Sequence, residues 1–190
     1  MDKKEDKRIT RTKHELLEAF FKMAEEMSFE DITVNELCQR AGIKRATFYK
    51  HFNDKYNFIT YVTKSLRAEF DAQMLESGMP DDSVEYFFEY ARAVILFLEE
   101  KEIAIKRMLE SDMASTLINI IVEQNYIDTE KRLDKSAHGA LSLPAQTDTV
   151  AVMITGGITH IILRWLREGK EKSSEELTGE IKLILNRFFK

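Results

Sequence analysis

The stretch ITVNELCQRAGIKRATFYKHFNDKYNFI, residues 32–59, places two short helical patterns around a glycine. Thr33 followed by Glu36 is a capping-box pattern and predicts the start of the first helix. Gly42 predicts a turn with a positive φ after it, and a second short helix is expected over residues 44–51. Two short helices joined by a glycine-containing turn predict a helix-turn-helix.

This unit has separate apolar and basic sides. Its expected core consists of four apolar side chains, Leu37, Ile43, Phe48 and Phe52. From residue 37 to residue 53 the chain carries four Lys/Arg residues and one histidine but no Asp or Glu. Such a surface can approach phosphate groups without local repulsion. A solvated helix face is the alternative interpretation, but Thr47 and Tyr49 among the cations favour contact with nucleic acid.

Helical periodicity continues through the rest of the chain. Apolar residues recur at spacings of three and four, and no stretch has convincing strand alternation. With only 7 glycines and 2 prolines in 190 residues, few positions interrupt a helix. The sequence predicts an all-α protein with a DNA-binding domain over residues 1–55 and a helical domain over residues 56–190. Further helices are expected over residues 10–27, 82–99, 103–109, 111–133, 145–168 and 174–189, with one long loop at 134–144. A long helix is also expected from a cap at Asn53 and Asp54 to the segment SGMP at residues 77–80.

Composition and charge exclude several classes of protein. Residues 1–55 hold 12 Lys/Arg and 11 Asp/Glu, whereas residues 56–190 hold 16 and 22, so the acidity belongs to the C-terminal part. Cys38 is the only cysteine, which excludes an internal disulfide framework and suits a buried hydrophobic position. The N-terminus lacks the apolar segment of a signal peptide. The longest apolar run, residues 150–163, is shorter than the roughly 20 residues of a membrane span. A cytoplasmic protein without a membrane partner is expected.

No pattern in the sequence points to catalysis. There is no glycine-rich phosphate loop and no pairing of a nucleophile with a base. The four histidines share no metal-ligand spacing: His14, His51, His138 and His160. The sequence therefore predicts no enzyme, no cofactor and no metal site.

The segment of residues 10–60 closely resembles the helix-turn-helix signature of TetR-type (tetracycline-repressor-like) transcriptional regulators. The resemblance implies a homodimer that places two recognition helices in successive major grooves of a palindromic double-stranded DNA operator. It also implies a repressor that a small apolar or amphipathic effector releases by binding in the C-terminal domain. An activator, or a regulator controlled by a protein partner, is the alternative. Beyond residue 60 the resemblance extends only to the helical layout and to residues 156–169.

The resemblance carries specific roles to residues of this unit. Six positions match family positions that usually hold the phosphate backbone: Thr33, Thr47, Tyr49, Lys50, His51 and Lys55. Two match positions at the base edges: Arg45 and Ala46. Arg45 is the candidate for a bidentate contact to guanine. Lys44 stands where the family usually has a capping residue, so phosphate or water is expected to satisfy the free amide there. Ser28 stands where a glycine commonly ends the first helix.

The helix expected over residues 145–168 is apolar nearly all round and has to be covered on two faces. With the last helix it predicts a dimer interface. The expected interface residues are Ile154, Ile158, Ile161, Ile162, Trp165, Leu177, Ile181, Ile184, Leu185 and Phe188. Burial of both faces inside one subunit is the alternative.

Aromatic and methionine side chains of the C-terminal part suggest a ligand cavity with a few polar groups. The candidate lining residues are Phe87, Phe88, Tyr90, Phe97, Met108, Met113, Asn125, Tyr126, Met153 and His160. An ordinary hydrophobic core is the alternative explanation for each of them, and His160 alone on an apolar face is also explained as a core histidine.

Overall fold

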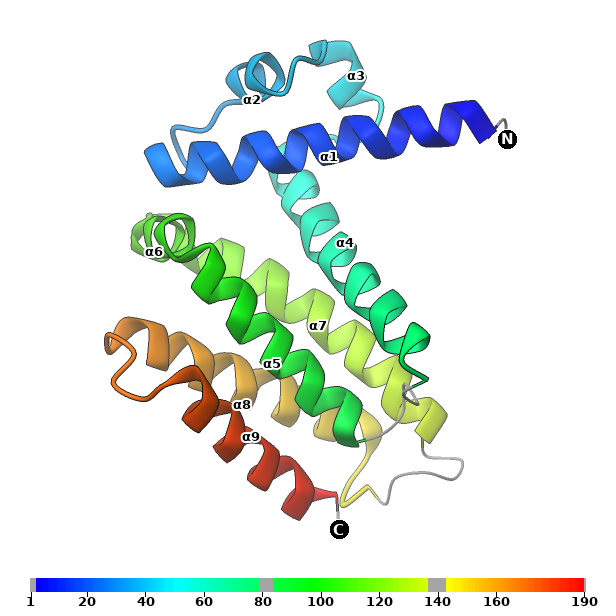
Figure 1. Cartoon of the computed structure of the whole chain (residues 1–190), viewed down its shortest axis with the longest axis vertical. Coiled ribbons are helices and arrows are strands. Elements are labelled where there is room, and N and C mark those ends of the chain that lie inside the picture. Colours follow the sequence, from blue (N-terminus) through cyan, green and yellow to red (C-terminus); the bar gives the residue numbers. More distant parts are fainter. Residues whose placement is uncertain (1–2, 79–83, 137–142, 190) are drawn as a thin grey trace. The chain divides into compact units, whose positions relative to one another are not determined.

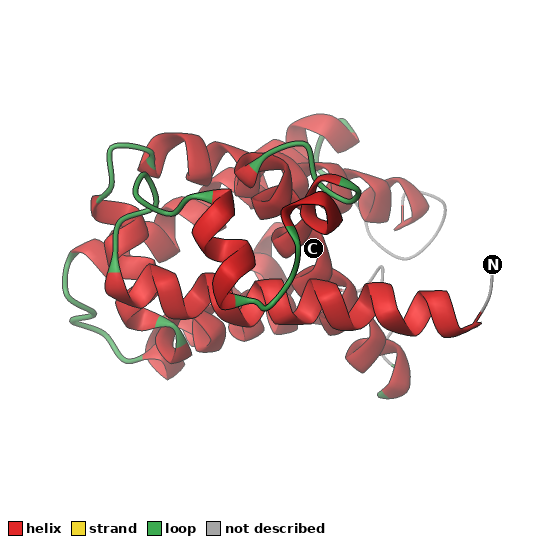
Figure 2. Ribbon diagram, turned by 90° about the horizontal axis from the view of Figure 1, so that it is seen from above, coloured by secondary structure: helices red, strands yellow, loops and turns green. Residues whose placement is uncertain are grey.

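A computed structural model describes residues 3–78, 84–136 and 143–189 of the chain. These residues form helices and loops without a strand, as the sequence predicts (Figures 1 and 2). The helices are α1 (Lys3–Glu26), α2 (Val34–Arg40), α3 (Arg45–Tyr49), α4 (Lys55–Glu76), α5 (Val84–Glu100), α6 (Glu102–Glu110), α7 (Ala114–Ser136), α8 (Thr147–Arg167) and α9 (Ser174–Phe188). Most of the expected loop at 134–144 lies outside the described residues.

Packing divides the chain into two compact units. The first comprises residues 1–62 and 101–118, and the second comprises residues 63–100 and 119–190. The division therefore falls within α4 and again within α7. The second unit begins at residue 63, near the expected domain boundary at residue 55. The assignment of separate functions to the two sides of that boundary stays a prediction. Residues 101–118, which the sequence assigned to the C-terminal domain, pack within the first unit.

The first unit is held together by an aromatic core. The ring of Phe20 meets those of Phe29 and Phe58 edge to face, with centroids 6.4 and 5.7 Å apart. Phe48 of α3 and Phe52 pack on the same Phe58. Edge-to-face pairs add about 0.5–1.5 kcal/mol each beyond the burial of their area. The predicted core is confirmed for Leu37, Phe48 and Phe52, whereas Ile43 is only partly buried.

A polar contact joins two loops of this unit. The carboxylate of Glu30 accepts a hydrogen bond from the backbone N–H of Met113, 2.8 Å away, just before α7. Hydrogen bonds from its own backbone N–H and from that of Met113 lower the pKa of Glu30. The contact fixes residues 111–114 beside the loop between α1 and α2, while α6 packs against α1.

Side-chain caps define several helix starts. Thr33 accepts a hydrogen bond from the amide of Glu36, but the carboxylate of Glu36 pairs with Arg40, so the structure shows only one half of the capping box. Ser173 and Glu176 form a complete box before α9. Asp54 accepts from the amide of Asn57 at the start of α4. The expected start of the first helix at residue 10 is wrong, because α1 begins at Lys3 and runs through that position.

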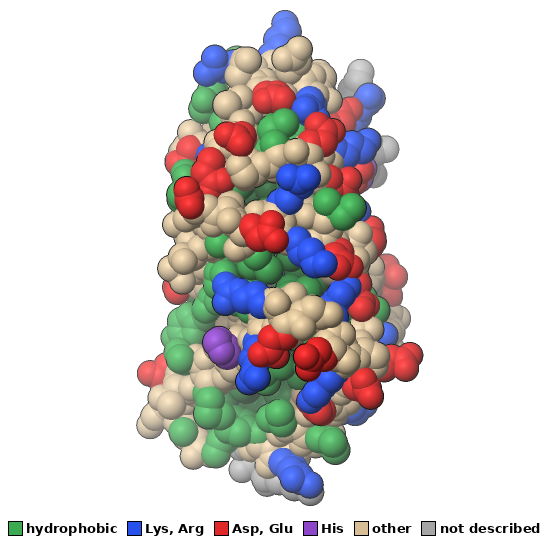
Figure 3. All heavy atoms as spheres, turned by 90° about the vertical axis from the view of Figure 1, so that its left-hand side faces the viewer, with side chains coloured by type: hydrophobic (Ala, Val, Ile, Leu, Met, Phe, Trp, Pro, Cys, Tyr) green, Lys and Arg blue, Asp and Glu red, His purple; other side chains and the backbone are tan. Residues whose placement is uncertain are grey.

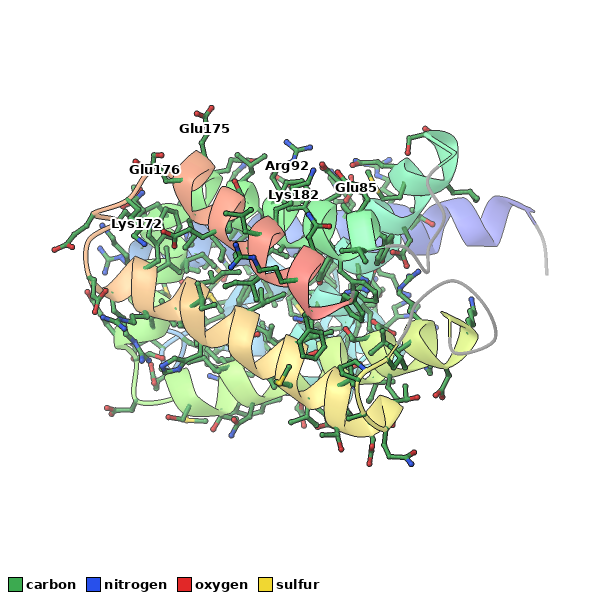
Figure 4. The ribbon with its side chains drawn as sticks, turned by 90° about the horizontal axis from the view of Figure 1, so that it is seen from below. Glu85, Arg92, Lys172, Glu175, Glu176 and Lys182 are labelled. Carbon is green, nitrogen blue, oxygen red and sulfur yellow. The ribbon has the colours of Figure 1, made fainter. Side chains whose placement is uncertain are left out.

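In the second unit α5, α7, α8 and α9 lie side by side (Figure 1). Lys182 of α9 points toward Glu85 of α5 and pairs with it at 2.8 Å (Figure 4). Its ammonium also lies 4.2 Å from the ring centroid of Phe88. Trp165 of α8 is buried and donates its indole N–H to the carbonyl of Lys172, 2.7 Å away.

α8 is longer than the apolar run at residues 150–163 that it contains. With 21 residues and a mean hydropathy of 1.5 in its most apolar window, it meets the length and composition of a membrane span. The length and composition of the whole helix therefore do not exclude a span, although the apolar run at residues 150–163 is shorter than one. Core helices of soluble proteins meet the same criteria, and α8 buries one face against its own unit. Only 39% of that window is buried, so much of the helix surface remains uncovered.

Candidate functional site

The turn before α3 has the geometry that its sequence predicts. Gly42 adopts φ +67°, a left-handed conformation that favours glycine. The amide of Ile43 then donates to the carbonyl of Cys38, 2.9 Å away, which closes the end of α2. Lys44 is the N-cap of α3 and makes no side-chain capping hydrogen bond. The start of α3 therefore offers free amide groups to an anion, although a helix of five residues contributes little dipole.

The outer face of α3 and its flanks are basic and exposed. Phe48 is buried, while the neighbouring side chains point outward or are partly exposed. The guanidinium of Arg45 lies 5.9 Å from the ring centroid of Tyr49, which is 49% exposed. The expected contact residues gathered here are Lys44, Arg45, Ala46, Thr47, Tyr49, Lys50 and His51, with Thr33 exposed at the start of α2.

Lys55 has a different role from the one that the resemblance implies. Its ammonium donates to the carbonyls of Phe29, Glu30 and Ile32 at 2.8, 3.1 and 3.2 Å. A lysine ammonium has three donors, so all of them are used. The group also lies 4.5 Å from the centroid of the Phe29 ring, and burial lowers the pKa of Lys55. Lys55 fixes the loop between α1 and α2, and we withdraw it from the expected phosphate contacts.

His51 lies beside two cations at the edge of this surface. Partial burial, together with the charges of Lys13 and Lys50, lowers the pKa of His51 below its ordinary value. In the unbound protein the imidazole is therefore predominantly neutral at pH 7. A nearby phosphate would favour the charged form, so the protonation of His51 is sensitive to an anion at this surface.

The second unit contains a small cavity between α5, α7 and α8. Its volume is about 50 Å³, and it is lined by Phe87, Tyr90, Ala91, Val94, Asn125, Thr129, Ile154, Thr155, Ile158, Thr159 and Ile162. The hydroxyl of Tyr90 donates to Oδ1 of Asn125 at 2.8 Å. Thr155 is 7% exposed, and its hydroxyl has no hydrogen-bond partner among the described residues.

The structure brings only part of the expected ligand set together. Phe87, Tyr90 and Asn125 line the cavity. The other expected residues do not, for reasons of packing. Met108 and Met113 belong to the first unit, Lys182 covers Phe88, and Tyr126 donates to Glu130 of its own helix. Met153 and His160 are exposed on α8, and Phe97 of α5 lies outside the cavity lining.

The expected dimer residues divide into an inner and an outer set. Six are buried within their own unit and form its core: Ile154, Ile162, Trp165, Leu177, Ile181 and Leu185. Their burial agrees with the alternative that these faces are covered inside one subunit, although Ile154, Ile181 and Leu185 also line a groove at the surface. Four remain exposed or partly exposed: Ile158, Ile161, Ile184 and Phe188.

An open apolar groove lies between α8 and α9. Its volume is about 200 Å³, and it is lined by the outer set, by Met153 and Gly157, and by three residues of the inner set, Ile154, Ile181 and Leu185. Met153 is 51% exposed and Ile184 55% exposed. Figure 3 shows hydrophobic side chains gathered at the surface in the lower half of the view. Exposed apolar patches of this kind mark interaction sites.

Metal ligation is not indicated. The described residues contain no cluster of His, Cys, Asp or Glu side chains that could hold a metal ion. His138 lies outside the described residues. Cys38 is buried, and burial raises the pKa of its thiol, which makes it a poor metal ligand or nucleophile.

Sequence analysis missed a charged cluster in the second unit. Arg67 and Asp71 of α4 meet Tyr86 of α5 and Arg132 of α7 there. A signal was present in the sequence, because Arg67 directly follows Leu66 of an apolar stripe at helical spacing, formed by Ile59, Val62, Leu66 and Phe70.

Comparisons with known proteins agree with this arrangement. The family model described as bacterial regulatory proteins, tetR family, matches residues 13–62. An uncharacterized HTH-type transcriptional regulator of Bacillus subtilis, YxbF, is 23% identical over 192 residues, which cover 97% of this chain and 47% of that protein. The chain thus spans about half the length of this curated relative.

Two solved structures share the fold of the whole chain. A putative TetR-family transcriptional regulator from Syntrophomonas wolfei has a TM-score of 0.69 at 12% identity, with 93% of this chain and 94% of that one covered. Another from Rhodococcus sp. has the same TM-score at 17% identity, with 95% and 100% covered. Both similarities extend beyond the helix-turn-helix to the helical C-terminal part.

Proposed function

We propose that this chain, whose residues 13–62 match the model of the tetR family of bacterial regulatory proteins, is a TetR-type transcriptional regulator: a dimeric repressor of a palindromic operator, released by a small-molecule effector. It is a regulator and not an enzyme. The single observation that carries the proposal is the exposed basic face of α3, set on a packed aromatic core and free of carboxylates from residue 37 to residue 53.

The proposed DNA contacts follow from that face. Arg45 and Ala46 would meet base edges, and Arg45 has the fork of donors that matches O6 and N7 of guanine. Thr33, Lys44 and the exposed side chains at the end of α3 would hold phosphates and fix the register. The amides at the uncapped start of α3 are available to the same phosphate backbone.

The groove between α8 and α9 supports dimerisation. Ile184 and Met153 are about half exposed there, and their burial against a second copy would remove apolar surface from water. A two-fold axis brings the same patch of each subunit into contact, so two copies of α8 and α9 would form a four-helix interface. Such a dimer presents two α3 helices to two half-sites, which accounts for the proposed palindrome.

The cavity between α5, α7 and α8 supports effector binding. It combines apolar walls with Tyr90, Asn125 and the unpartnered hydroxyl of Thr155, the composition of a small-molecule site. An effector that prefers one arrangement of these helices would change DNA affinity by a coupling of roughly 1–3 kcal/mol. Weaker binding to the operator would relieve repression.

Recovery and sequencing of genomic DNA fragments bound by the purified protein tests the DNA-binding function. We expect enrichment of a palindrome whose half-sites lie about one helical turn apart. The Arg45→Ala variant serves as the control and should enrich the palindrome less strongly, with a relaxed preference at one base pair in each half-site. A wild-type protein that enriches no common sequence would overturn the proposal.

A further inference from the structure

The cavity between α5, α7 and α8 has an uncharged wall. Five of its eleven lining residues carry a hydroxyl or an amide group, and the other six are apolar. The polar residues are Tyr90, Asn125, Thr129, Thr155 and Thr159. No Lys, Arg, His, Asp or Glu of the described residues lines the cavity. An ion placed there would therefore lose its hydration without gaining an opposite charge.

A charged cluster lies behind one wall of the cavity. The guanidinium carbon of Arg67 is 3.7 Å from the centroid of the Tyr90 ring. Arg67 is paired with Asp71, whose carboxylate also pairs with Arg132, and none of these three residues lines the cavity. The ring of Tyr90 thus separates the cluster from a ligand, and we assign no ionic contact between the two.

Two equally buried threonines of the second unit differ in their hydrogen bonds. Thr155 of α8 and Thr178 of α9 are each 7% exposed. The hydroxyl of Thr178 donates to the carbonyls of Ser174 and Glu175 in its own helix, at 2.8 and 3.0 Å. The hydroxyl of Thr155 has no such partner among the described residues, and its oxygen is shielded from water. A buried hydroxyl without a hydrogen bond is unfavourable, so Thr155 favours a ligand that supplies the missing partner.

Asn125 supplies a second donor to the cavity. The hydroxyl of Tyr90 donates to its Oδ1, 2.8 Å away, which leaves the amide nitrogen of Asn125 to donate to another group. Threonine in a helix has two accessible χ1 rotamers. A change of rotamer can therefore turn the hydroxyl of Thr155, which lines the cavity, toward an acceptor bound there.

We propose that the cavity binds an uncharged organic molecule through one oxygen acceptor, a carbonyl or ether oxygen, and that Thr155 selects this class. The inference rests on the proposed function and names the chemical class of its effector. Thr155 and Asn125 donate to the oxygen, while the apolar body packs against the isoleucines of α8. Carboxylates, phosphates and amines are rejected because the wall offers no opposite charge.

The cavity limits the size of the part of the ligand that it holds. Its volume is about 50 Å³. One water-sized group takes about 10–15 Å³ of such a volume, so roughly three to five non-hydrogen atoms fit without movement of the helices. The cavity is partly open to the surface, and a longer apolar chain can continue beyond it.

The test uses the whole chain and three probes with a four-carbon skeleton: butan-2-one, butanoate and the butylammonium ion. Butan-2-one should shift the NMR methyl signals of Thr155 and Ile158 with a Kd of about 1–10 mM, since so small a ligand binds weakly. Butanoate and butylammonium should bind at least about tenfold more weakly, because neither meets an opposite charge in the cavity.

Thr155→Val removes the hydroxyl and keeps the shape of the side chain. Its affinity for butan-2-one should fall about three- to tenfold, the effect of one neutral hydrogen bond. Without ligand its Tm should lie above that of the wild type, because the unpartnered hydroxyl is gone. Thr178→Val is the matched control, since the hydroxyl of Thr178 is already bonded. That variant should keep the affinity of the wild type and should not gain in Tm.

Four results would overturn the proposal. The first two are a wild type whose cavity signals do not respond to butan-2-one, and an equal affinity for either charged probe. The others are an undiminished affinity in Thr155→Val and a Tm of that variant below the wild type, which would show that the hydroxyl has a partner in the free protein. If Thr155→Val does not fold, Thr155→Ala should lose affinity and Thr155→Ser should keep it. Equal affinities of these two variants would contradict the proposal.

DNA binding in the same samples separates this inference from the proposed function. If butan-2-one binds through Thr155 without changing the affinity for the enriched DNA, the neutral site stands and effector control fails. If the wild type binds no DNA but still binds butan-2-one through Thr155, the proposed function fails and the neutral site again stands. If a charged probe binds in the cavity as well as butan-2-one and weakens DNA binding, effector control stands and the neutral class fails.

Discussion

Lys50 and Lys55, five residues apart, have opposite surroundings. Lys50 is exposed at the end of α3, whereas the ammonium of Lys55 donates to three backbone carbonyls of the preceding loop. A cation with all its donors used inside the protein has none for a phosphate. Two lysines that look equivalent in a basic motif therefore differ in what they bind.

This difference predicts distinct effects of two alanine substitutions. Lys50→Ala should weaken binding to operator and random DNA alike and reduce the slope of log affinity against log salt by about one unit. Lys55→Ala should lower the Tm and leave the salt slope of the folded protein unchanged. Fluorescence anisotropy across a salt series, combined with thermal unfolding, measures both. Equal salt slopes for Lys50→Ala and the wild type would remove Lys50 from the interface.

Arg45→Ala should weaken binding to the operator specifically, whereas Lys50→Ala should weaken binding to all DNA. If Arg45 forks onto a guanine, its loss should cost roughly 1–3 kcal/mol on the operator and relax the preference at one base pair in each half-site. Affinity for scrambled DNA should change little. The two duplexes are compared at one salt concentration, and equal losses on both would reassign Arg45 to the phosphate backbone.

His51 predicts a pH dependence of DNA binding. Burial and the charges of Lys13 and Lys50 lower its pKa in the free protein, and a phosphate contact would raise the pKa in the complex. DNA binding then takes up a proton, so affinity should increase as the pH falls from 7.5 to 6, by at most about tenfold per pH unit. His51→Gln should remove this dependence. A wild type and variant with parallel pH profiles would show that His51 does not titrate on binding.

At the scale of elements, the turn between α2 and α3 depends on one backbone conformation. Gly42 has φ +67°, and a Cβ added there would meet no atom within 4 Å. Gly42→Ala should therefore destabilise the fold by about 1–2 kcal/mol through backbone strain alone. Gly179→Ala is the matched control, because Gly179 lies in α9 with similar free space and without a positive φ. Alanine there should stabilise the helix by about 0.5–1 kcal/mol. Urea unfolding of both variants measures the contrast, and equal effects would mean that the turn tolerates a side chain.

At the scale of the whole molecule, the outer face of α8 and α9 predicts a constitutive homodimer. Ile184→Glu should place an unpaired carboxylate in the interface at a cost of several kcal/mol and yield a folded monomer. Leu75→Glu is the control, since Leu75 is also exposed but lies on α4, and it should remain dimeric. Sedimentation at micromolar concentration measures both. A monomeric wild type would contradict the dimer, and a dimeric Ile184→Glu variant would place the interface elsewhere.

The sequence by itself determined the all-α fold and the helix-turn-helix, because their signals are local. Helix periods, the cap at Thr33 and the positive φ of Gly42 depend on residues within a few positions of one another. The basic face of α3 is local too, since one short helix presents it. These features could be predicted without knowledge of which helices pack together.

Only the tertiary structure decided which side of each helix faces inward. Six residues of the expected dimer face are buried in their own unit, because apolar periodicity marks a stripe but not its partner. Lys55 meets carbonyls that lie 23 to 26 residues earlier in the chain. The charged cluster at Arg67 becomes visible only when α4, α5 and α7 bring Arg67 and Arg132 to Asp71. Such contacts join residues far apart in the chain, and no local pattern records them.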